Sequence, residues 1–504
     1  MDAPVPLIAC ALLAAGAILL RGPRLRAAST LGVLVLAPVL LLADIWDTDQ
    51  LRAVRDHPPA AIAAAVAGAL VVVALAWLVH RRPEALPVAA ALTIPFRVPI
   101  AVGGSTSNLL VPLYLVVAAG ALAYAVPRLV GGDGAERPPE RRPGALEWLL
   151  AIAVVLYAVQ ASYSDDRDQA LQSLVFFYVP FAVLFALLAR MTWTRALALR
   201  VLGVVSALAL VFVAVGFVEY ATRHLLLNPK IVAASQAGSA FRVNSLFFDP
   251  NMYGRFLAVV MIGLAATLLW TRRARDAGAL AAALVMLWAG LVLTLSQTSF
   301  AALLLGLLVL AGARWRLRWA IGTGVAALVA GAALVVLSPS AIDVHLDSAK
   351  GANTATSGRY ELVRGGVDLF RQRPLAGYGS GAFSVAYRRA EHAAGDSVSV
   401  SRSHTIPVTV AAEQGVIGLA AYVALLVAAF ATLLRGARAE PVRVALAAAF
   451  AALVLHTWSY AAFLEDPLTW ALLGAGLALA RAAADARPRR RRRPAQEPAV
   501  PVPA

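Results

Sequence analysis

The sequence predicts an all-α protein that crosses a membrane many times. Of its 504 residues, 61% are hydrophobic and only 14% are charged, which excludes a soluble globular domain of ordinary composition. Apolar runs of about 17 to 25 residues, long enough to cross the hydrocarbon core of a bilayer, recur along nearly the whole chain. Between them, basic segments alternate with acidic or neutral ones. We therefore expect about 12 to 15 transmembrane helices.

The first apolar run, "VPLIACALLAAGAILL", is expected to be a retained helix. No basic stretch precedes it and more apolar runs follow, unlike the pattern of a cleaved signal peptide. The only cysteine, Cys10, lies within this run, so the chain has neither a disulfide framework nor a cysteine metal site.

The loops between the apolar runs predict the orientation of the chain. Short basic loops mark the cytoplasmic side of a membrane. The acidic or neutral loops fall between the basic ones without conflict, which places the carboxyl terminus in the cytoplasm and residues 220–251 and 338–405 outside. The basic segments are residues 21–26, 81–82, 128–142, 190–200, 272–275, 314–318 and 435–443, and the tail.

This topology divides the chain into five regions. Two outer loops are too long to be simple connections, so functional residues are expected there. The basic tail is expected to be disordered and to contact anionic lipid, not nucleic acid. The regions are N-terminal helices in 1–219, central helices in 220–337 with the outer loop 220–251, the large outer loop 338–405, C-terminal helices in 406–483, and the tail 484–504.

The large outer loop contains the pattern of an amphipathic helix. In "TSGRYELVRGGVDLFRQRP", apolar residues recur at helical spacing and Pro374 follows the predicted end. A solvated helix face is the simpler interpretation of its arginines. Arginine on the outer side opposes the usual charge bias, however, and guanidinium groups bind phosphate oxygens through paired hydrogen bonds. The candidates for binding a pyrophosphate are Arg359 and Arg364, together with Arg402 further along the loop.

A glycine-rich segment, "PLAGYGSGAF", follows this helix, with Gly377, Gly379 and Gly381 at alternate positions. It is not a nucleotide-binding loop, because no Gly-Lys-Ser/Thr follows. We expect a tight turn that lets backbone approach the site closely.

His404 comes next, immediately before a long apolar run. With Thr405 as a cap and Pro407 in the first turn, it would lie at the amino terminus of a helix on the outer face. The positive potential there disfavours imidazolium, and a neutral histidine suits a general base. On local sequence alone, a histidine that hydrogen-bonds loop backbone is the favoured interpretation.

These residues resemble the carboxy-terminal region of the O-antigen ligase and O-antigen polymerase family of bacterial membrane glycosyltransferases. "SGRYELVRGGVDLFRQRPLAGYGSGAF" is similar to the family's arginine-led helix followed by Pro-x-x-Gly-x-Gly-x-Gly. "HTIPVTVAAEQGVIGLAAY" is similar to its histidine motif, which ends here in Gly415 and Gly418. The resemblance covers roughly residues 240 to 435. It implies a GT-C-like helical architecture in the bacterial plasma membrane, with the active site outside the cytoplasm.

The resemblance also implies roles for individual residues. Family members transfer a glycan from a polyprenyl-pyrophosphate donor to a glycan, lipid or protein acceptor, with neither a metal nor another cofactor. His404 would be the general base, and Arg359 would bind the pyrophosphate. Arg242, in "FRVNSLFFDPNMYGR", resembles a further arginine of the family. Arg97 resembles another, although there a structural role is favoured. Gly415 and Gly418 are expected to allow close helix packing.

One residue departs from the family pattern. Many members have Ser-Arg at the end of a mid-chain span, whereas this chain has Ser296 and Gln297. A contact between Gln297 and pyrophosphate would be a hydrogen bond from a neutral side chain. Alternatively, Arg364 or Arg402 would supply the charge of the missing arginine.

Two other classes of function remain as alternatives. A transporter or flippase for an amphiphilic substrate usually carries charged residues inside its spans. Here the candidates lie in outer loops and the spans contain almost no ionisable residue, with His456 and Glu219 near span ends, which favours the enzyme. The third class is a structural or assembly protein without chemistry.

Overall fold

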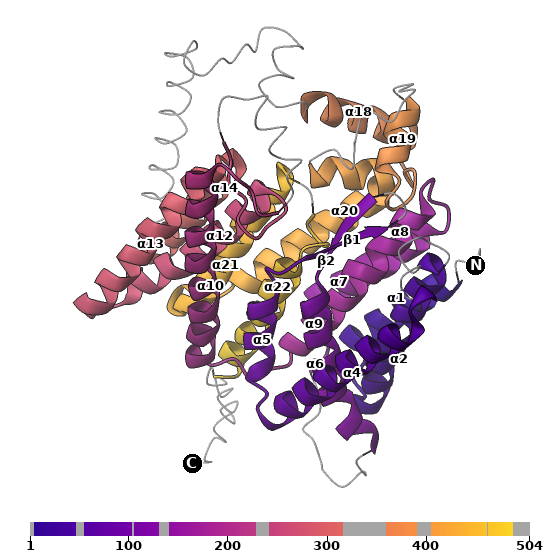
Figure 1. The fold of residues 1–504 in the computed structure, drawn as a ribbon, viewed down its shortest axis with the longest axis horizontal. Helices are drawn as coiled ribbons and strands as arrows, with labels where there is room; N and C mark the ends of the chain where they lie inside the picture. Colours follow the sequence, from indigo (N-terminus) through magenta and orange to yellow (C-terminus); the bar gives the residue numbers. More distant parts are fainter. Residues whose placement is uncertain are drawn as a thin grey trace, which may run out of the picture.

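The computed structural model describes residues 5–46, 55–102, 105–130, 141–227, 241–315, 359–390, 405–460 and 462–486. The helices lie side by side in a bundle with two ends (Figure 1). We call the end that carries α18 (Arg359–Gln372) and α19 (Phe383–Ala390) the upper end, and the end where α22 (Pro467–Asp485) finishes the lower end. His404 and Arg402 lie outside the described residues, as do most of the large outer loop and the basic tail.

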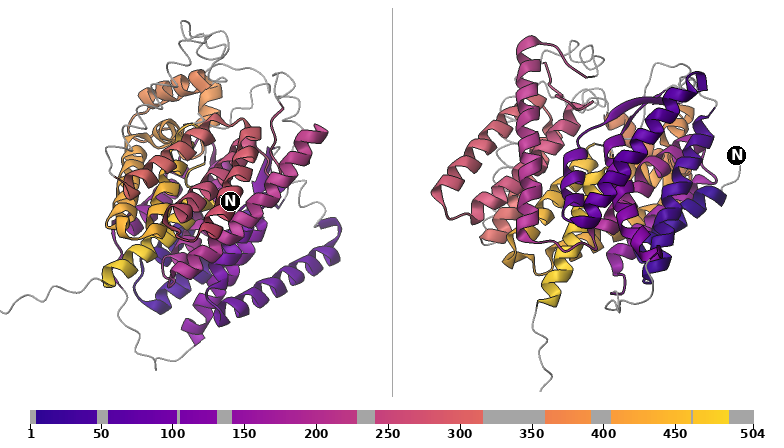
Figure 2. Two further views of the ribbon diagram at one scale, coloured as in Figure 1. Left: turned by 90° about the vertical axis from the view of Figure 1, so that its left-hand side faces the viewer. Right: turned by 60° about the horizontal axis from the view of Figure 1, so that its bottom comes forward.

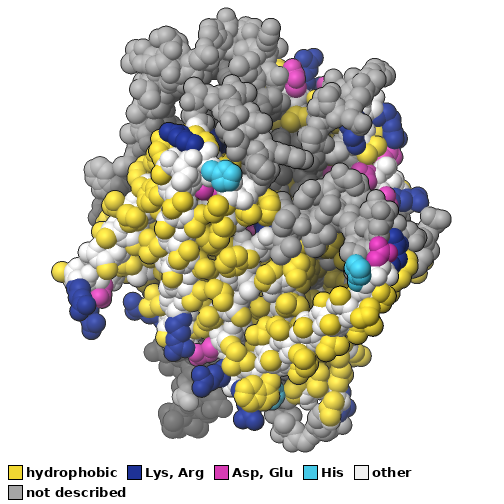
Figure 3. Space-filling view, in the orientation of Figure 1, with side chains coloured by type: hydrophobic (Ala, Val, Ile, Leu, Met, Phe, Trp, Pro, Cys, Tyr) yellow, Lys and Arg dark blue, Asp and Glu magenta, His cyan; other side chains and the backbone are white. Residues whose placement is uncertain are grey.

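The predicted polytopic all-α fold is confirmed. Among the described residues, 11 helices are long and apolar enough to cross a membrane, and two shorter apolar helices, α1 (Val5–Leu19) and α7 (Ala145–Ala161), accompany them. The face seen in Figure 3 is a broad belt of hydrophobic side chains with lysine or arginine along its lower margin. A belt of this kind matches the hydrocarbon of a bilayer.

The helices form two hydrophobic cores. The first core joins α1, α2 (Pro23–Ile45), α6 (Val111–Val130), α7, α9 (Val179–Leu188), α20 (Ile406–Leu434) and α22. The second joins α10 (Arg195–Thr222), α12 (Pro250–Trp270), α13 (Ala274–Thr294), α14 (Gln297–Arg314) and α21 (Pro441–Trp458). Both figures of the ribbon show α10, α12, α13 and α14 grouped to one side of the N-terminal helices (Figures 1 and 2). Helices α21 and α22 pack together and connect the two cores.

The remaining helical segments are short or lie at the margins. Helix α4 (Pro58–Arg81) packs mainly on α6 and is exposed along most of its length. Helix α8 (Arg167–Ser173) leads through a π-helical turn, Leu174–Tyr178, into α9, and a 3-10 turn, Ala437–Ala439, precedes α21.

One crossing is not a continuous helix. Helix α5 (Ala85–Thr93) has nine residues and rises about 14 Å, less than half of the hydrocarbon thickness. The chain continues as an antiparallel hairpin, β1 (Val98–Val102) and β2 (Ser105–Leu109), in which Val98 pairs with Leu109. Helix α5 packs between α6 and α10, and such a break is tolerated where protein surrounds it. The sequence analysis did not predict this break.

Buried and half-buried arginines at the lower end donate hydrogen bonds to helix carbonyls. Arg190 donates to the carbonyl of Ile18 at 2.6 Å, and Arg443 donates to that of Arg435 at 2.8 Å. Arg26 likewise donates to Leu20 and is buried. The last carbonyls of a helix have no partner within the helix, so these contacts give the lower-end arginines a structural role in addition to their effect on orientation.

Candidate functional site

The glycine segment 374–383 docks on a kink in α20. Gly415 interrupts this helix with φ of +64°, and Val416 behind it donates from its backbone N–H to the carbonyl of Pro374 at 2.7 Å. Gly379 donates in the same way to Glu413 at 2.8 Å. The sequence predicted helix packing for Gly415. In the structure, its non-helical backbone leaves α20 groups free to hydrogen-bond with the loop. An added Cβ at Gly418 would meet the side chain of Gln414 on its own helix.

The carboxylate of Glu413 completes this docking. It accepts from the backbone N–H of Gly381 at 3.0 Å and of Phe383, the first residue of α19, at 3.2 Å. On the other side of the loop, Ser164 donates to the carbonyl of Ser380 at 2.8 Å. The predicted tight turn therefore connects α7, α19 and α20 at the upper end.

Positive φ angles explain the alternating glycines. Gly377, Gly379 and Gly381 have φ of +69°, +95° and +78°. A Cβ at Gly377 would collide with the backbone of Glu413, and one at Gly379 with the backbone of Ser164. Other residues are strained in this region of backbone space.

Replacing Gly379 by alanine is therefore expected to destabilise the docked loop by at least about 1–2 kcal/mol. Hydrogen–deuterium exchange measures this as faster exchange of the amides in residues 374–383. Gly68→Ala on α4 is the matched control, because a Cβ there meets nothing within 4 Å. Equal exchange in the two variants would refute the role given to the turn.

The amphipathic helix predicted in the large loop is α18, which packs on α20. Its arginines are not gathered around one point. Arg371 contacts Asp368 at 3.1 Å, Arg373 lies 4.3 Å from the ring centre of Tyr378, and Arg364 is exposed. Arg359 begins α18, but its side chain is outside the described part.

The structure shows a buried polar cluster at the upper ends of α12, α14, α21 and α22. We use this name for a set of residues whose side chains contact one another or interact electrostatically: Arg97, Arg242, Asp249, Asn251, Arg255, Ser296, Thr298, Ser299, His456, Tyr460 and Asp466. Within this set, three arginines and two aspartates leave one positive charge in surplus before His456 and the neighbouring Glu465 are counted. The arginines of the cluster can bind an anion.

Arg242 is held at the edge of this cluster. Its Nε donates to the carbonyl of Thr294 at 2.9 Å, and its Nη2 donates to Oδ1 of Asn251 at 3.3 Å. The loop that carries it is anchored by Glu219 of α10, which accepts from the backbone N–H of Ser245 at 2.7 Å. Arg242 thus belongs to the polar cluster and not to the large loop.

The position of the family departure lies in the same cluster. Gln297 is exposed at the first position of α14. Ser296 caps this helix and donates to Asn251 at 2.8 Å, while Thr298 and Ser299 lie 3.3 and 3.2 Å from Nε2 of the fully buried His456. The chain neighbours of Gln297 therefore belong to the cluster, whereas the exposed side chain of Gln297, where the family pattern has an arginine, does not.

A buried ion pair forms the other half of the cluster. Nη2 of Arg255 lies 2.5 Å from Oδ2 of Asp466, and both side chains are only 3% exposed. Asp466 also caps α22, since its Oδ1 accepts from the backbone N–H of Leu468 at 2.9 Å. Arg97, at the end of the broken crossing, interacts electrostatically with Asp466 and Arg255.

Tyr460 lies between α21 and α22 and hydrogen-bonds Asp249. Burial raises the pKa of Tyr460, and the carboxylate of Asp249 raises it further. The phenol therefore stays neutral and remains a hydrogen-bond donor near neutral pH.

Arg255, Asp466 and the burial of His456 were not predicted from the sequence. The prediction that the spans hold almost no ionisable residue is wrong, because Glu147, Arg255 and Glu413 are buried within helices. Two signals were available in the sequence. Arg255 lies in the second turn of the apolar helix α12, and Asp466 lies in "EDP" at the start of α22. Neither shows which partner it meets.

A small cavity lies between the start of α20 and the segment that directly precedes Asp466. It has a volume of about 60 Å³ and is lined by Ile406 and Thr409 of α20 on one side and by Phe463 and Glu465 on the other. Asp466 follows directly in the chain. His404, which is outside the described residues, precedes Ile406 by two positions in the sequence.

Fold and site together define a polytopic membrane protein whose polar groups gather at one end of its helical bundle. Residues 281–423 match the family model described as O-Antigen ligase. This match confirms the predicted resemblance to the O-antigen ligase family over most of α13, over α14, α18 and α19, and over the first part of α20. Comparison with curated proteins gives no match. The family match supports membrane glycan transfer in general.

Proposed function

We propose that the protein transfers a glycan from a polyprenyl-pyrophosphate donor to an acceptor hydroxyl at its upper end. The observation that carries this proposal is the position of the surplus positive charge. Arg255 pairs with Asp466 and Arg97 interacts with it electrostatically, while Arg242 contacts Asn251 of the same cluster. The segment 463–465, which directly precedes Asp466, lies across a small cavity from the first turn of α20. Pyrophosphate released from the anomeric carbon needs charge stabilisation, and arginine supplies it.

In this mechanism His404 takes the proton of the acceptor hydroxyl while the glycosidic bond to pyrophosphate breaks. Direct displacement inverts the anomeric configuration. Arg242 contacts the leaving group, and Arg359, Arg364 and Arg402 on the large loop provide further charge. Arg255 is already neutralised by Asp466, so its role is to hold the positions of α12 and α22.

The proposed orientation places the lower end in the cytoplasm of a bacterial cell and the upper end outside. Support comes from arginines at or near the lower termini of the helices. They include Arg21, Arg24, Arg81, Arg128, Arg195, Arg272, Arg314 and Arg435.

The purified chain tests the reaction directly. With a polyprenyl-pyrophosphate glycan and an acceptor glycan or lipid, we expect a joined product and released polyprenyl pyrophosphate. A matched polyprenyl-monophosphate glycan should give little product, because the arginines act on the pyrophosphate leaving group. Equal rates with the two donors would contradict the assignment of these arginines.

Arg242→Gln is expected to weaken binding of the carrier product by about tenfold to a hundredfold, the effect of losing a hydrogen bond to a charged group. The measurement is the inhibition constant of polyprenyl pyrophosphate in the transfer assay. Arg223→Gln is the control, since Arg223 is exposed near the same end and lies 4.4 Å from the ring centre of Tyr220. Identical inhibition constants for the two variants would remove Arg242 from the donor site.

A transporter remains the second candidate, because of the broken crossing at α5 and the buried Arg255–Asp466 pair. Both features occur where transporters bind substrate inside a bundle. Movement of the lipid-linked glycan across proteoliposomes that lack any acceptor would favour this function over transfer.

A further inference from the structure

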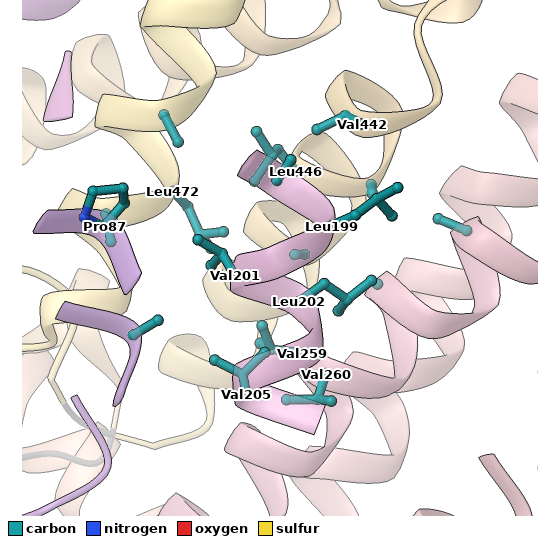
Figure 4. A pocket seen from close by; sticks show the side chains of 18 of the residues that line it. Pro87, Leu199, Val201, Leu202, Val205, Val259, Val260, Val442, Leu446 and Leu472 are labelled. Atoms are coloured by element: carbon teal, nitrogen blue, oxygen red, sulfur yellow. The ribbon is translucent and has the colours of Figure 1, made fainter. Parts of the chain in front are cut away.

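A second cavity lies between the two hydrophobic cores, in the lower part of the bundle. It has a volume of about 220 Å³ and is lined by α5, α10, α12, α21 and α22. Figure 4 shows side chains from these helices pointing into a common space, among them Val201, Leu202 and Val205 of α10. From Phe256 to Trp270 it follows α12 for about 21 Å. We call it the inter-core groove.

The lining of the groove is apolar apart from Arg195 and Thr267. The hydroxyl of Thr267 donates to Gly263 at 2.9 Å in its own helix, so it offers nothing to a ligand that binds along the groove. A groove of this length and polarity inside a membrane protein fits a hydrocarbon chain.

The lower mouth carries positive charge and tryptophan. Arg195 begins α10 and makes no ion pair or hydrogen bond with any residue that the structure describes. Trp193 and Trp270 line the same mouth, and Arg272 and Arg273 follow Trp270 in the chain. Three acidic residues lie near the lower mouth in the sequence: Glu84 pairs with Arg200, Glu440 precedes Pro441, and Asp276 lies in the first turn of α13. They face four arginines, Arg195, Arg200, Arg272 and Arg273. The charge balance at the mouth is therefore positive.

The opposite end of the groove is closed by aromatic rings. Phe256 lines it there and packs against Phe212 and Phe247, with ring centres 5.7 and 5.5 Å away. These rings belong to the second core, below the loop that carries the buried polar cluster. A lipid with its headgroup at the lower mouth and its acyl chain in the groove is thus separate from an anion bound by the buried polar cluster.

We propose that the inter-core groove binds one anionic phospholipid of the lower leaflet. Its acyl chain lies between α10, α12 and α22, and its headgroup phosphate contacts Arg195 beside Trp193 and Trp270. Tryptophan at the membrane interface and basic pockets between helices on the cytoplasmic side are typical of such sites. The lipid fills the seam between the two cores and holds them together. This site is independent of glycan transfer.

Native mass spectrometry of the full-length chain in detergent tests the proposal, with dioleoyl phosphatidylglycerol and dioleoyl phosphatidylcholine as probes. We expect one phosphatidylglycerol retained per chain and no retained phosphatidylcholine. Arg195→Gln should weaken retention about fivefold, the effect of one arginine at an anionic headgroup. Arg200→Gln, on the same helix but paired with Glu84, should leave it unchanged.

A second pair of variants tests the chain-binding part of the groove. Val201→Trp fills the groove and should abolish retention, whereas Val211→Trp, on the bilayer-facing side of α10 with 56% exposure, should not. Equal retention of the two lipids, equal effects within either pair of variants, or displacement of phosphatidylglycerol by polyprenyl pyrophosphate would each overturn the assignment. Displacement would indicate that the groove binds the polyprenyl chain of the donor.

Discussion

Replacing His404 by alanine is expected to lower the rate of glycan transfer by a factor of about 10²–10⁴, the usual contribution of a general base. The acceptor hydroxyl would then have to lose its proton to water. The measurement is the initial rate of product formation by the purified variant, with expression and size-exclusion profile as checks on folding.

His57→Ala is the matched control for this variant. His57 is exposed at the start of α4, away from the matched domain, so its removal should leave the rate unchanged. A His404→Ala protein that transfers glycan at the normal rate would exclude this histidine as the base.

Asp466→Ala is expected to destabilise the protein by about 3–5 kcal/mol, because it leaves Arg255 buried without its counter-charge. It also removes the cap of α22. Thermal or denaturant unfolding in detergent micelles measures the loss. Glu84→Ala breaks an exposed ion pair with Arg200 and should cost less than about 1 kcal/mol.

A double variant separates the stability of this pair from its effect on the site. Arg255→Met combined with Asp466→Leu removes both charges together, and such replacements are often neutral or stabilising. We expect it to recover most of the stability lost in Asp466→Ala while transfer remains reduced, since α22 still lacks its cap beside the cavity. If Asp466→Ala unfolds at the same temperature as Glu84→Ala, the ion pair has no structural importance.

The membrane helices were predictable because each needs only its own run of apolar residues to cross a bilayer. The exceptions have long-range causes. Helix α5 stops at Thr93 and gives way to a hairpin, and this break depends on neighbours α6 and α10 that replace the missing helical packing. The kink of α20 at Gly415 depends on the loop that begins at Pro374. Helix α10 is about 100 residues from α5, and Pro374 is about 40 residues from Gly415, so local sequence shows neither contact.

The candidate site was predictable where a motif is local. The amphipathic helix and the glycine turn were found, and the turn has the positive φ angles that glycine allows. The buried polar cluster was not predicted, because the whole of the matched segment 281–423 lies between Arg255 and Asp466 in the sequence and each residue has an ordinary local explanation. Their pairing is a property of helix packing, and only the structure shows it.

Product formation in sealed proteoliposomes tests the central claim most directly. The vesicles contain the purified chain, a polyprenyl-pyrophosphate glycan and an acceptor. We predict that joined glycan and released polyprenyl pyrophosphate appear in equal amounts, and that neither appears with His404→Ala. Movement of intact donor across the membrane with no joined product would contradict the account and identify a transporter.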